Sequence, residues 1–179
     1  MSGTTRRGLA GAASAGLLPT VAVAQTNDAG PSLTHRFSLN VKVAPAQELG
    51  EVGGGRRRVI PITGGDIKGA GLDGEVLPGG ADWQTIRADG VTLLQARYTL
   101  RMKDGATVGI INTGIRRAPI EIVRRLTAGE IVAPSLYYFR TSAVFEVGPG
   151  PYQWLTESIF VCVGERLPDV VRMKVFQVA

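Results

Sequence analysis

Apolar and polar side chains alternate along the stretch from residue 33 to residue 43. The apolar parity holds Leu33, His35, Phe37, Leu39, Val41 and Val43, and the other parity holds Thr34, Arg36, Ser38, Asn40 and Lys42. Successive side chains of a β-strand point to opposite faces of a sheet. This period-two pattern therefore predicts a strand with one buried face.

Strand-like runs separated by glycine-rich turns continue along the rest of the chain. Asp-Gly pairs at residues 73–74, 89–90 and 104–105 each stand between strand-like residues, which is typical of tight β-hairpins. The glycines of Thr63-Gly64-Gly65 lie within such a run, where glycine is typical of a bulge or a barrel corner. Further strands are predicted over residues 59–67, 74–77, 82–87, 91–102, 107–115, 136–147, 152–163 and 170–178.

One stretch, from Pro119 to Gly129, has a helical pattern. Pro119 suits the first turn of a helix, and Gly129 suits its end. Ile122, Val123 and Leu126 share one face between them. Many short antiparallel strands with tight turns and one short helix predict an all-β fold, an antiparallel β-barrel of about 8–10 strands.

The first 24 residues have the pattern of an export signal. Arg6 and Arg7 precede an uncharged run over residues 8–24 that ends in Ala22-Val23-Ala24, a pattern that signal peptidases accept. The paired arginines favour twin-arginine export, with a general secretory signal or a disordered tail as alternatives. We therefore expect a periplasmic or secreted protein with a single β-barrel domain over residues 25–179.

Charge and composition argue against several classes of partner. The net charge is +5, and it falls to +3 without Arg6 and Arg7. The remaining basic residues are scattered, apart from Arg56-Arg57-Arg58, so no nucleic-acid partner is expected. The uncharged run near the N-terminus is too short and too weakly apolar for a membrane span, and no other span is expected in the mature chain.

No metal or cofactor site is predicted. The chain has one His and one Cys, so it offers no pair of zinc ligands. Cys162 lies in an apolar run and is interpreted as a buried small hydrophobic residue. Gly53-Gly54-Gly55 lacks the lysine and the following helix of a phosphate-binding loop.

Several motifs, in this order and spacing, resemble those of the domain-of-unknown-function 3237 family, which is also called uncharacterised protein family 0311. They are Ile62-Thr63-Gly64-Gly65, the run Gly74 to Trp83 with Gly79-Gly80-Ala81-Asp82-Trp83, Ala96-Arg97-Tyr98-Thr99, Asp104-Gly105, Tyr138-Phe139-Arg140-Thr141, Phe145-Glu146, Tyr152-x-Trp154-Leu155 and Arg166-Leu167-Pro168-Asp169. The resemblance extends from about residue 33 to residue 178. It implies a small β-barrel and no established reaction, so it carries no catalytic roles to this chain. Most members of the family lack an export signal.

Two residues are candidate catalytic groups. His35 is a polar residue on the apolar face of its predicted strand, and an imidazole suits proton transfer near neutral pH. The alternatives are a core histidine satisfied by one hydrogen bond or a residue at the exposed end of the strand. Asp82 follows the sharp turn at Pro78-Gly79-Gly80, where it either acts as a base at the barrel mouth or binds the turn backbone.

Arginines, acids and aromatic residues on the predicted strands are candidate ligand-binding groups. If the Arg97 face points inward, Arg97 pairs with a carboxylate or clamps a ligand carboxylate; if it points outward, Arg97 is a solvated charge. The aromatic candidates are either cavity walls with polar tips or ordinary core residues. The full set is Glu75, Trp83, Arg97, Tyr98, Arg140, Glu146 and Trp154.

The leading functional hypothesis is a barrel that binds a small, partly apolar organic acid or ketone-like molecule. In its enzymatic form this is a cofactor-free isomerase or lyase, in which Asp82 or His35 moves a proton and an arginine stabilises negative charge. One alternative is a non-catalytic periplasmic binding protein with the same pocket. Another is a filled structural barrel whose aromatic surface forms a homo-oligomer.

Overall fold

Antiparallel strands make up most of the chain that the structure, a computed structural model, describes, namely residues 1, 3, 30–69 and 71–179. The predicted export signal over residues 1–24 lies outside the described residues, apart from residues 1 and 3. Residues 31–179 form one compact unit. No helix in the described ranges is long and apolar enough to cross a membrane.

The elements of the described chain are ten strands, one α-helix and two short 3₁₀ helices. In chain order they are β1 (Leu33–Val43), β2 (Gln47–Val52), β3 (Gly55–Gly69), β4 (Leu72–Val76), β5 (Ala81–Ile86), β6 (Thr92–Met102), β7 (Thr107–Arg117), α1 (Ile120–Thr127), η1 (Pro134–Leu136), β8 (Tyr138–Glu146), η2 (Gln153–Thr156), β9 (Phe160–Arg166) and β10 (Val170–Val178).

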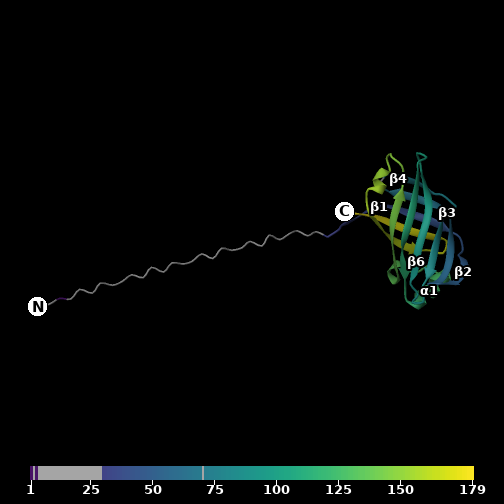
Figure 1. Cartoon of the computed structure of the whole chain (residues 1–179), viewed down its shortest axis with the longest axis horizontal. Coiled ribbons are helices and arrows are strands. Elements are labelled where there is room, and N and C mark those ends of the chain that lie inside the picture. The colour runs from purple at the N-terminus through teal and green to yellow at the C-terminus, as the bar shows by residue number, and fades with distance from the viewer. Residues whose placement is uncertain (2, 4–29, 70) are drawn as a thin grey trace. The chain divides into compact units, whose positions relative to one another are not determined.

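The strands close into a barrel. Strands β1, β10, β9, β8, β7 and β6 pair in that order, all antiparallel, and β3 pairs with β1 to complete the ring. Between β3 and β6, one position is shared by β4 and β5, because each of them pairs with both neighbours. The barrel thus has eight positions, with β2 added at its edge (Figure 1). The all-β barrel prediction is confirmed.

The seam between β1 and β3 depends on glycine. The register shifts between Lys42, which pairs with Gly64, and Val43, which pairs with Ile62. This shift confirms the predicted bulge at these glycines. Gly65, at φ +139°, lies so close to β1 that a Cβ atom would overlap the carbonyl oxygen of Asn40.

The barrel interior is densely packed over one half. Phe37, Phe145 and Phe160 are almost fully buried and contact one another, with ring centroids 5.2 Å apart for Phe145 and Phe160. Leu39 and Leu100 are completely buried in the same cluster. The other half of the interior, further along the same strands, holds the pocket described below.

Two segments differ from the sequence prediction. Strand β2 was not expected, and its side chains are all exposed, so no buried face marks it in the sequence. The predicted strand over residues 152–163 is wrong in its first half, because residues 153–156 form η2 and β9 begins only at residue 160. The helix predicted from Pro119 is confirmed as α1, and Gly129 follows it at φ +80°.

Candidate functional site

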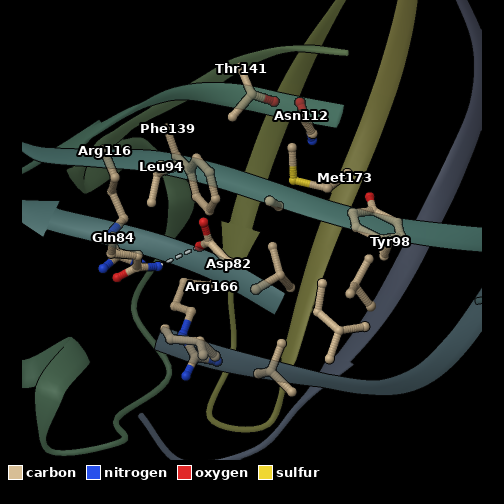
Figure 2. A pocket seen from close by; sticks show the side chains of 16 residues that line it. Asp82, Gln84, Leu94, Tyr98, Asn112, Arg116, Phe139, Thr141, Arg166 and Met173 are labelled. Atoms are coloured by element: carbon tan, nitrogen blue, oxygen red, sulfur yellow. Dashed lines mark hydrogen bonds between the residues drawn. The ribbon is translucent and has the colours of Figure 1, made fainter. Parts of the chain in front are cut away.

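A partly enclosed pocket opens in the half of the barrel that the aromatic core leaves free (Figure 2). Strands β1, β3 and β5 to β10 all contribute inward side chains to its wall. The space inside it that a water-sized molecule can reach has a volume of about 50 Å³. We call it the Asp82 pocket; its polar lining residues are Asp82, Gln84, Tyr98, Asn112, Arg116, Thr141 and Arg166.

Asp82 is held on the inner face of β5 by two hydrogen bonds. Its Oδ2 accepts a hydrogen bond of 2.5 Å from Gln84 Nε2, and its Oδ1 accepts one of 3.0 Å from the backbone N–H of Gln95. Gln84 is fixed in turn, because its Oε1 accepts a hydrogen bond of 2.9 Å from Arg58 Nε. The carboxyl group is therefore oriented by a chain of side chains from β3 and β5.

Burial raises the pKa of Asp82 above the ordinary value of an aspartate. The hydrogen bonds from Gln84 and Gln95 and the positive charges of Arg116 and Arg58 oppose this shift without cancelling it. A carboxyl group whose pKa is raised toward neutrality holds and releases a proton more readily at working pH than an exposed one does.

The raised pKa of Asp82 predicts a pH-dependent cost to folding. Between the ordinary carboxyl pKa of about 4 and the raised pKa, the folded state binds more protons than the unfolded state. The stability that protonated Asp82 contributes is therefore complete below about pH 4 and is lost as the pH rises through the raised pKa. Across this pH range, the wild type should lose unfolding free energy relative to Asp82→Asn, at most about 1.4 kcal/mol for each pH unit.

Urea unfolding of both proteins between about pH 3.5 and pH 8 measures this difference. Because the introduced asparagine does not titrate, the difference between the two curves isolates the carboxyl group. A difference that stays constant with pH, or that grows in favour of the wild type, would contradict the raised pKa.

At the inner end of the pocket, three buried polar side chains lack partners. By hydrogen-bond geometry, the Tyr98 hydroxyl, the Asn112 carbonyl oxygen and the Thr141 hydroxyl have no partner among the residues that the structure describes. The Asn112 side chain nevertheless lies close enough to Tyr98, and Thr141 close enough to the Cys162 thiol, to lower the pKa of each of these two groups. All three residues are buried, with 5%, 5% and 7% of their surface exposed. Burial has the larger effect and raises the pKa of Tyr98, so its hydroxyl stays protonated and is available as a donor. An unpaired buried polar atom is costly, and a ligand with hydroxyl or carbonyl groups would satisfy these three.

The outer end of the pocket is basic. Arg116 from β7 and Arg166 from β9 line it together with Asp82 and Gln84, and Figure 2 shows this group apart from Tyr98, Asn112 and Thr141. Burial, followed by the charges of Arg58 and Arg166, lowers the pKa of Arg116 to about 10. Arg166 donates a hydrogen bond to the backbone carbonyl of Leu167.

Of the candidate residues from the sequence, Asp82 and Tyr98 line the pocket. His35 does not, because a bulge shifts the register of β1 between His35 and Phe37. The bulge breaks the parity that placed the imidazole on the apolar face. His35 is exposed, shares a hydrogen bond of 3.1 Å with Ser38, and packs against Phe176.

The remaining candidates lie outside the pocket, most of them on the outer face of the barrel. Arg97 is exposed and pairs with Glu146 at 3.3 Å, because Tyr98 and its neighbours of the same parity take the inner face of β6. Glu75 pairs on the outside with Arg101. Trp83 is 41% exposed, Arg140 lies over the Tyr138 ring, and Trp154 packs in η2 against Phe160 and Arg36.

Five polar pocket residues were not predicted from the sequence: Gln84, Asn112, Arg116, Thr141 and Arg166. A signal for two of them was present in the strand patterns. Asn112 follows Val108 and Ile110 on the apolar parity of β7, and Thr141 interrupts the buried row of β8. The two arginines lie near strand ends, where parity alone does not separate a pocket mouth from solvent.

Comparison with known proteins places this barrel in a family. The family model described as protein of unknown function DUF3237 matches residues 31–178. The chain belongs to the DUF3237 family. This membership confirms the resemblance found in the sequence motifs.

Two bacterial relatives match most of the chain. A UPF0311 protein of Rhodopseudomonas palustris is 44% identical over 142 residues, which are 79% of this chain and 93% of that protein. The crystal structure of an R. palustris protein of unknown function matches with a TM-score of 0.79 at 41% identity, covering 83% of this chain and 97% of that one. A UPF0311 protein of Clostridium acetobutylicum is 45% identical over 125 residues, 70% of this chain and 79% of that protein.

Two proteins of the fungus Penicillium herquei show a more distant similarity to this DUF3237 barrel. The hydroalkoxylation enzyme phnH of Penicillium herquei is 33% identical over 78 residues, 44% of this chain and 52% of that protein. The crystal structure of an enzyme from the same fungus matches with a TM-score of 0.65 and covers 86% of this chain and 98% of that one. At 20% identity, this second likeness shows a shared fold alone.

Among the described residues of this DUF3237 member, no three His, Cys, Asp or Glu side chains come together as metal ligands would. Its single cysteine, Cys162, is buried, and burial raises the pKa of its thiol to about 11. The chemistry available in the pocket is thus that of one carboxyl group, two guanidinium groups and neutral hydrogen-bonding groups.

Proposed function

We propose that the barrel binds a small, partly apolar organic molecule in the Asp82 pocket and that Asp82 transfers a proton on it. The observation that carries the proposal is the arrangement of polar groups in this pocket. The carboxyl group of Asp82 faces the same space as the unpaired polar atoms of Tyr98, Asn112 and Thr141. Apolar walls with a few convergent polar groups are typical of small-molecule sites.

Two features favour an enzyme over a binding protein. A general acid or base needs a fixed orientation, and Asp82 has one from the hydrogen bonds of Gln84 and Gln95. It also needs a pKa moved toward working pH, and burial moves the pKa of Asp82 in that direction. A pocket that only binds its ligand requires neither feature.

The fungal relative suggests the class of reaction. In a hydroalkoxylation, the O–H group of an alcohol or phenol adds across a carbon–carbon double bond. A C–O bond and a C–H bond form while the O–H bond and the π bond break, so the proton lost from oxygen is balanced by the proton added to the other alkene carbon. Within one molecule this is an isomerisation without oxidant or reductant, and one carboxyl group can supply and take back the proton.

We propose that the DUF3237 barrel catalyses a proton-transfer isomerisation or addition of this kind without a cofactor. The predicted export signal would place the reaction in the periplasm or outside the cell. The alternative, a non-catalytic binding protein, uses the same pocket and differs only in the fate of the ligand.

Asn112→Leu tests the pocket. The substitution removes an unpaired buried oxygen, so the free energy of unfolding is expected to stay the same or rise. It also removes a ligand contact, so affinity should fall at least ~10-fold. Native mass spectrometry of the protein isolated from its own host first identifies a retained small molecule, and titration calorimetry then compares the wild type with the variant.

The matched control is Thr113→Val, which changes the neighbouring side chain on the exposed face of β7. We expect it to bind as the wild type does. Equal affinity of Asn112→Leu and the wild type would place the ligand elsewhere. If neither the native protein nor a panel of hydroxy and keto compounds gives a bound species, the proposal fails.

A further inference from the structure

Arginines inside the pocket and arginines outside the barrel differ in their partners. On the outside, Arg97 pairs with Glu146 at 3.3 Å and Arg101 pairs with Glu75 at 2.5 Å. Arg116 and Arg166 in the pocket have no carboxylate within 4.0 Å in the described part of the chain. A largely buried cation without a counter-ion is costly, so something must compensate for it.

Asp82 compensates Arg116 only in part, because it attracts Arg116 but forms no ion pair with it within 4.0 Å. Each of its oxygens already accepts a hydrogen bond, from Gln84 and from the backbone of Gln95. It is also the single carboxyl group in the pocket lining, against two guanidinium groups. Arg58 lies close enough to repel both Arg116 and Arg166, although it pairs with Glu48 at 3.9 Å and Asp169 attracts Arg166 from outside the pocket lining. Among the side chains that line the pocket, guanidinium groups therefore outnumber carboxyl groups.

The positively charged and the neutral polar side chains lie in different parts of the pocket. In Figure 2, Arg116 and Arg166 lie with Asp82 toward one end, while Tyr98, Asn112 and Thr141 lie toward the other. On β7, Arg116 and Asn112 are four residues apart, which corresponds to roughly 13 Å along an extended strand. The apolar side chains of Leu94 and Phe139 also line this pocket.

We infer that Arg116 and Arg166 bind the carboxylate of the ligand, so that the ligand is an organic acid held with its charged end at the pocket mouth. This inference rests on the proposed function and names its substrate class. The apolar body of the acid lies along Leu94 and Phe139, and its hydroxyl or carbonyl group reaches Asn112 and Thr141. Asp82, beside the arginines, then faces the part of the molecule next to the carboxylate. Guanidinium groups suit this role because they bind carboxylates through two parallel hydrogen bonds.

Matched pairs of acid and amide probes test whether the pocket prefers a ligand with a carboxylate. Hydroxyphenyl carboxylic acids with side chains of two to five carbons are titrated calorimetrically against the wild type, each next to its neutral primary amide. We expect the best acid to bind at least ~10-fold more tightly than its amide. Arg116→Gln should remove this preference, because it weakens the binding of the acid and leaves that of the amide unchanged. Arg116→Lys should restore part of the preference because the positive charge is kept.

Arg97→Gln is the control, since it removes a guanidinium group on the outer face that is already paired. It should keep the full preference, and urea unfolding of each variant confirms that the barrel is intact. Equal binding of acid and amide to the wild type would overturn the carboxylate site and leave the proposed pocket function standing. Binding of inorganic phosphate as tight as that of the best acid would assign the arginines to a free anion instead. If neither acids nor amides bind, both proposals fail.

Discussion

Asp82→Asn is expected to lower the turnover number at least ~100-fold while the protein stays folded and still binds its ligand. An amide cannot take up or release the proton, and general acid–base groups contribute about 10²- to 10⁴-fold to rate. The side chains are nearly the same size, and the amide oxygen still accepts a hydrogen bond. The measurement is the rate of product formation by liquid chromatography, with the retained molecule or phenols that carry an alkene side chain as substrates.

Asp66→Asn is the matched control, because Asp66 lies on the outer face of β3 and accepts a hydrogen bond from Asn40. It should leave turnover unchanged. Retained activity of Asp82→Asn would remove Asp82 from the mechanism. A wild type that binds these molecules without converting any of them would favour the non-catalytic binding protein.

Gly65→Ala is expected to lower the free energy of unfolding by about 3 kcal/mol or more. At φ +139° an L side chain is strained, and the new Cβ atom would overlap the carbonyl oxygen of Asn40. The clash involves backbone, so no side chain can move aside to relieve it. Because β1 and β3 close the barrel here, their separation would open the ring. Urea denaturation monitored by tryptophan fluorescence measures the loss.

Gly53→Ala serves as the control for this substitution. A Cβ atom at Gly53 meets nothing within 4 Å and requires no left-handed backbone. Its unfolding midpoint should stay close to that of the wild type. Equal midpoints for the two alanine variants would show that the β1–β3 seam tolerates a side chain at residue 65.

Most of the barrel could be predicted from the sequence because its strands have one buried and one exposed face. Strand β8 alternates between exposed and buried side chains along its whole length. Strand β2 could not be predicted in this way, since it packs on β3 at the edge and buries no side chain. The segment with Trp154 was predicted as part of a strand because its apolar residues run on toward β9. Residues 153–156 instead form the 3₁₀ helix η2, which buries Leu155.

The site was harder to predict than the fold, and two residues explain why. Asp82 was found because it follows a sharp turn and shares its motif with the family. His35 was favoured by parity, but a single extra residue at the bulge before Phe37 moves it to the exposed face. A bulge in β1 leaves no clear mark in the sequence when neither glycine nor proline accompanies it. Arg116 and Arg166 come together from two strands that are not adjacent, and no local pattern predicts such a contact.

The division of the barrel interior has a consequence for how such proteins diversify. Strands β1, β6 and β8 each supply side chains both to the aromatic core and to the pocket, at successive inward positions. Residues such as Phe37 and Phe145 secure the fold at one end, while Thr141 at the other end lies outside the buried hydrophobic cluster and Ala96 is only partly buried against it. Exchanges at Ala96 or Thr141 can therefore change which ligand fits, while the scaffold around them keeps its architecture.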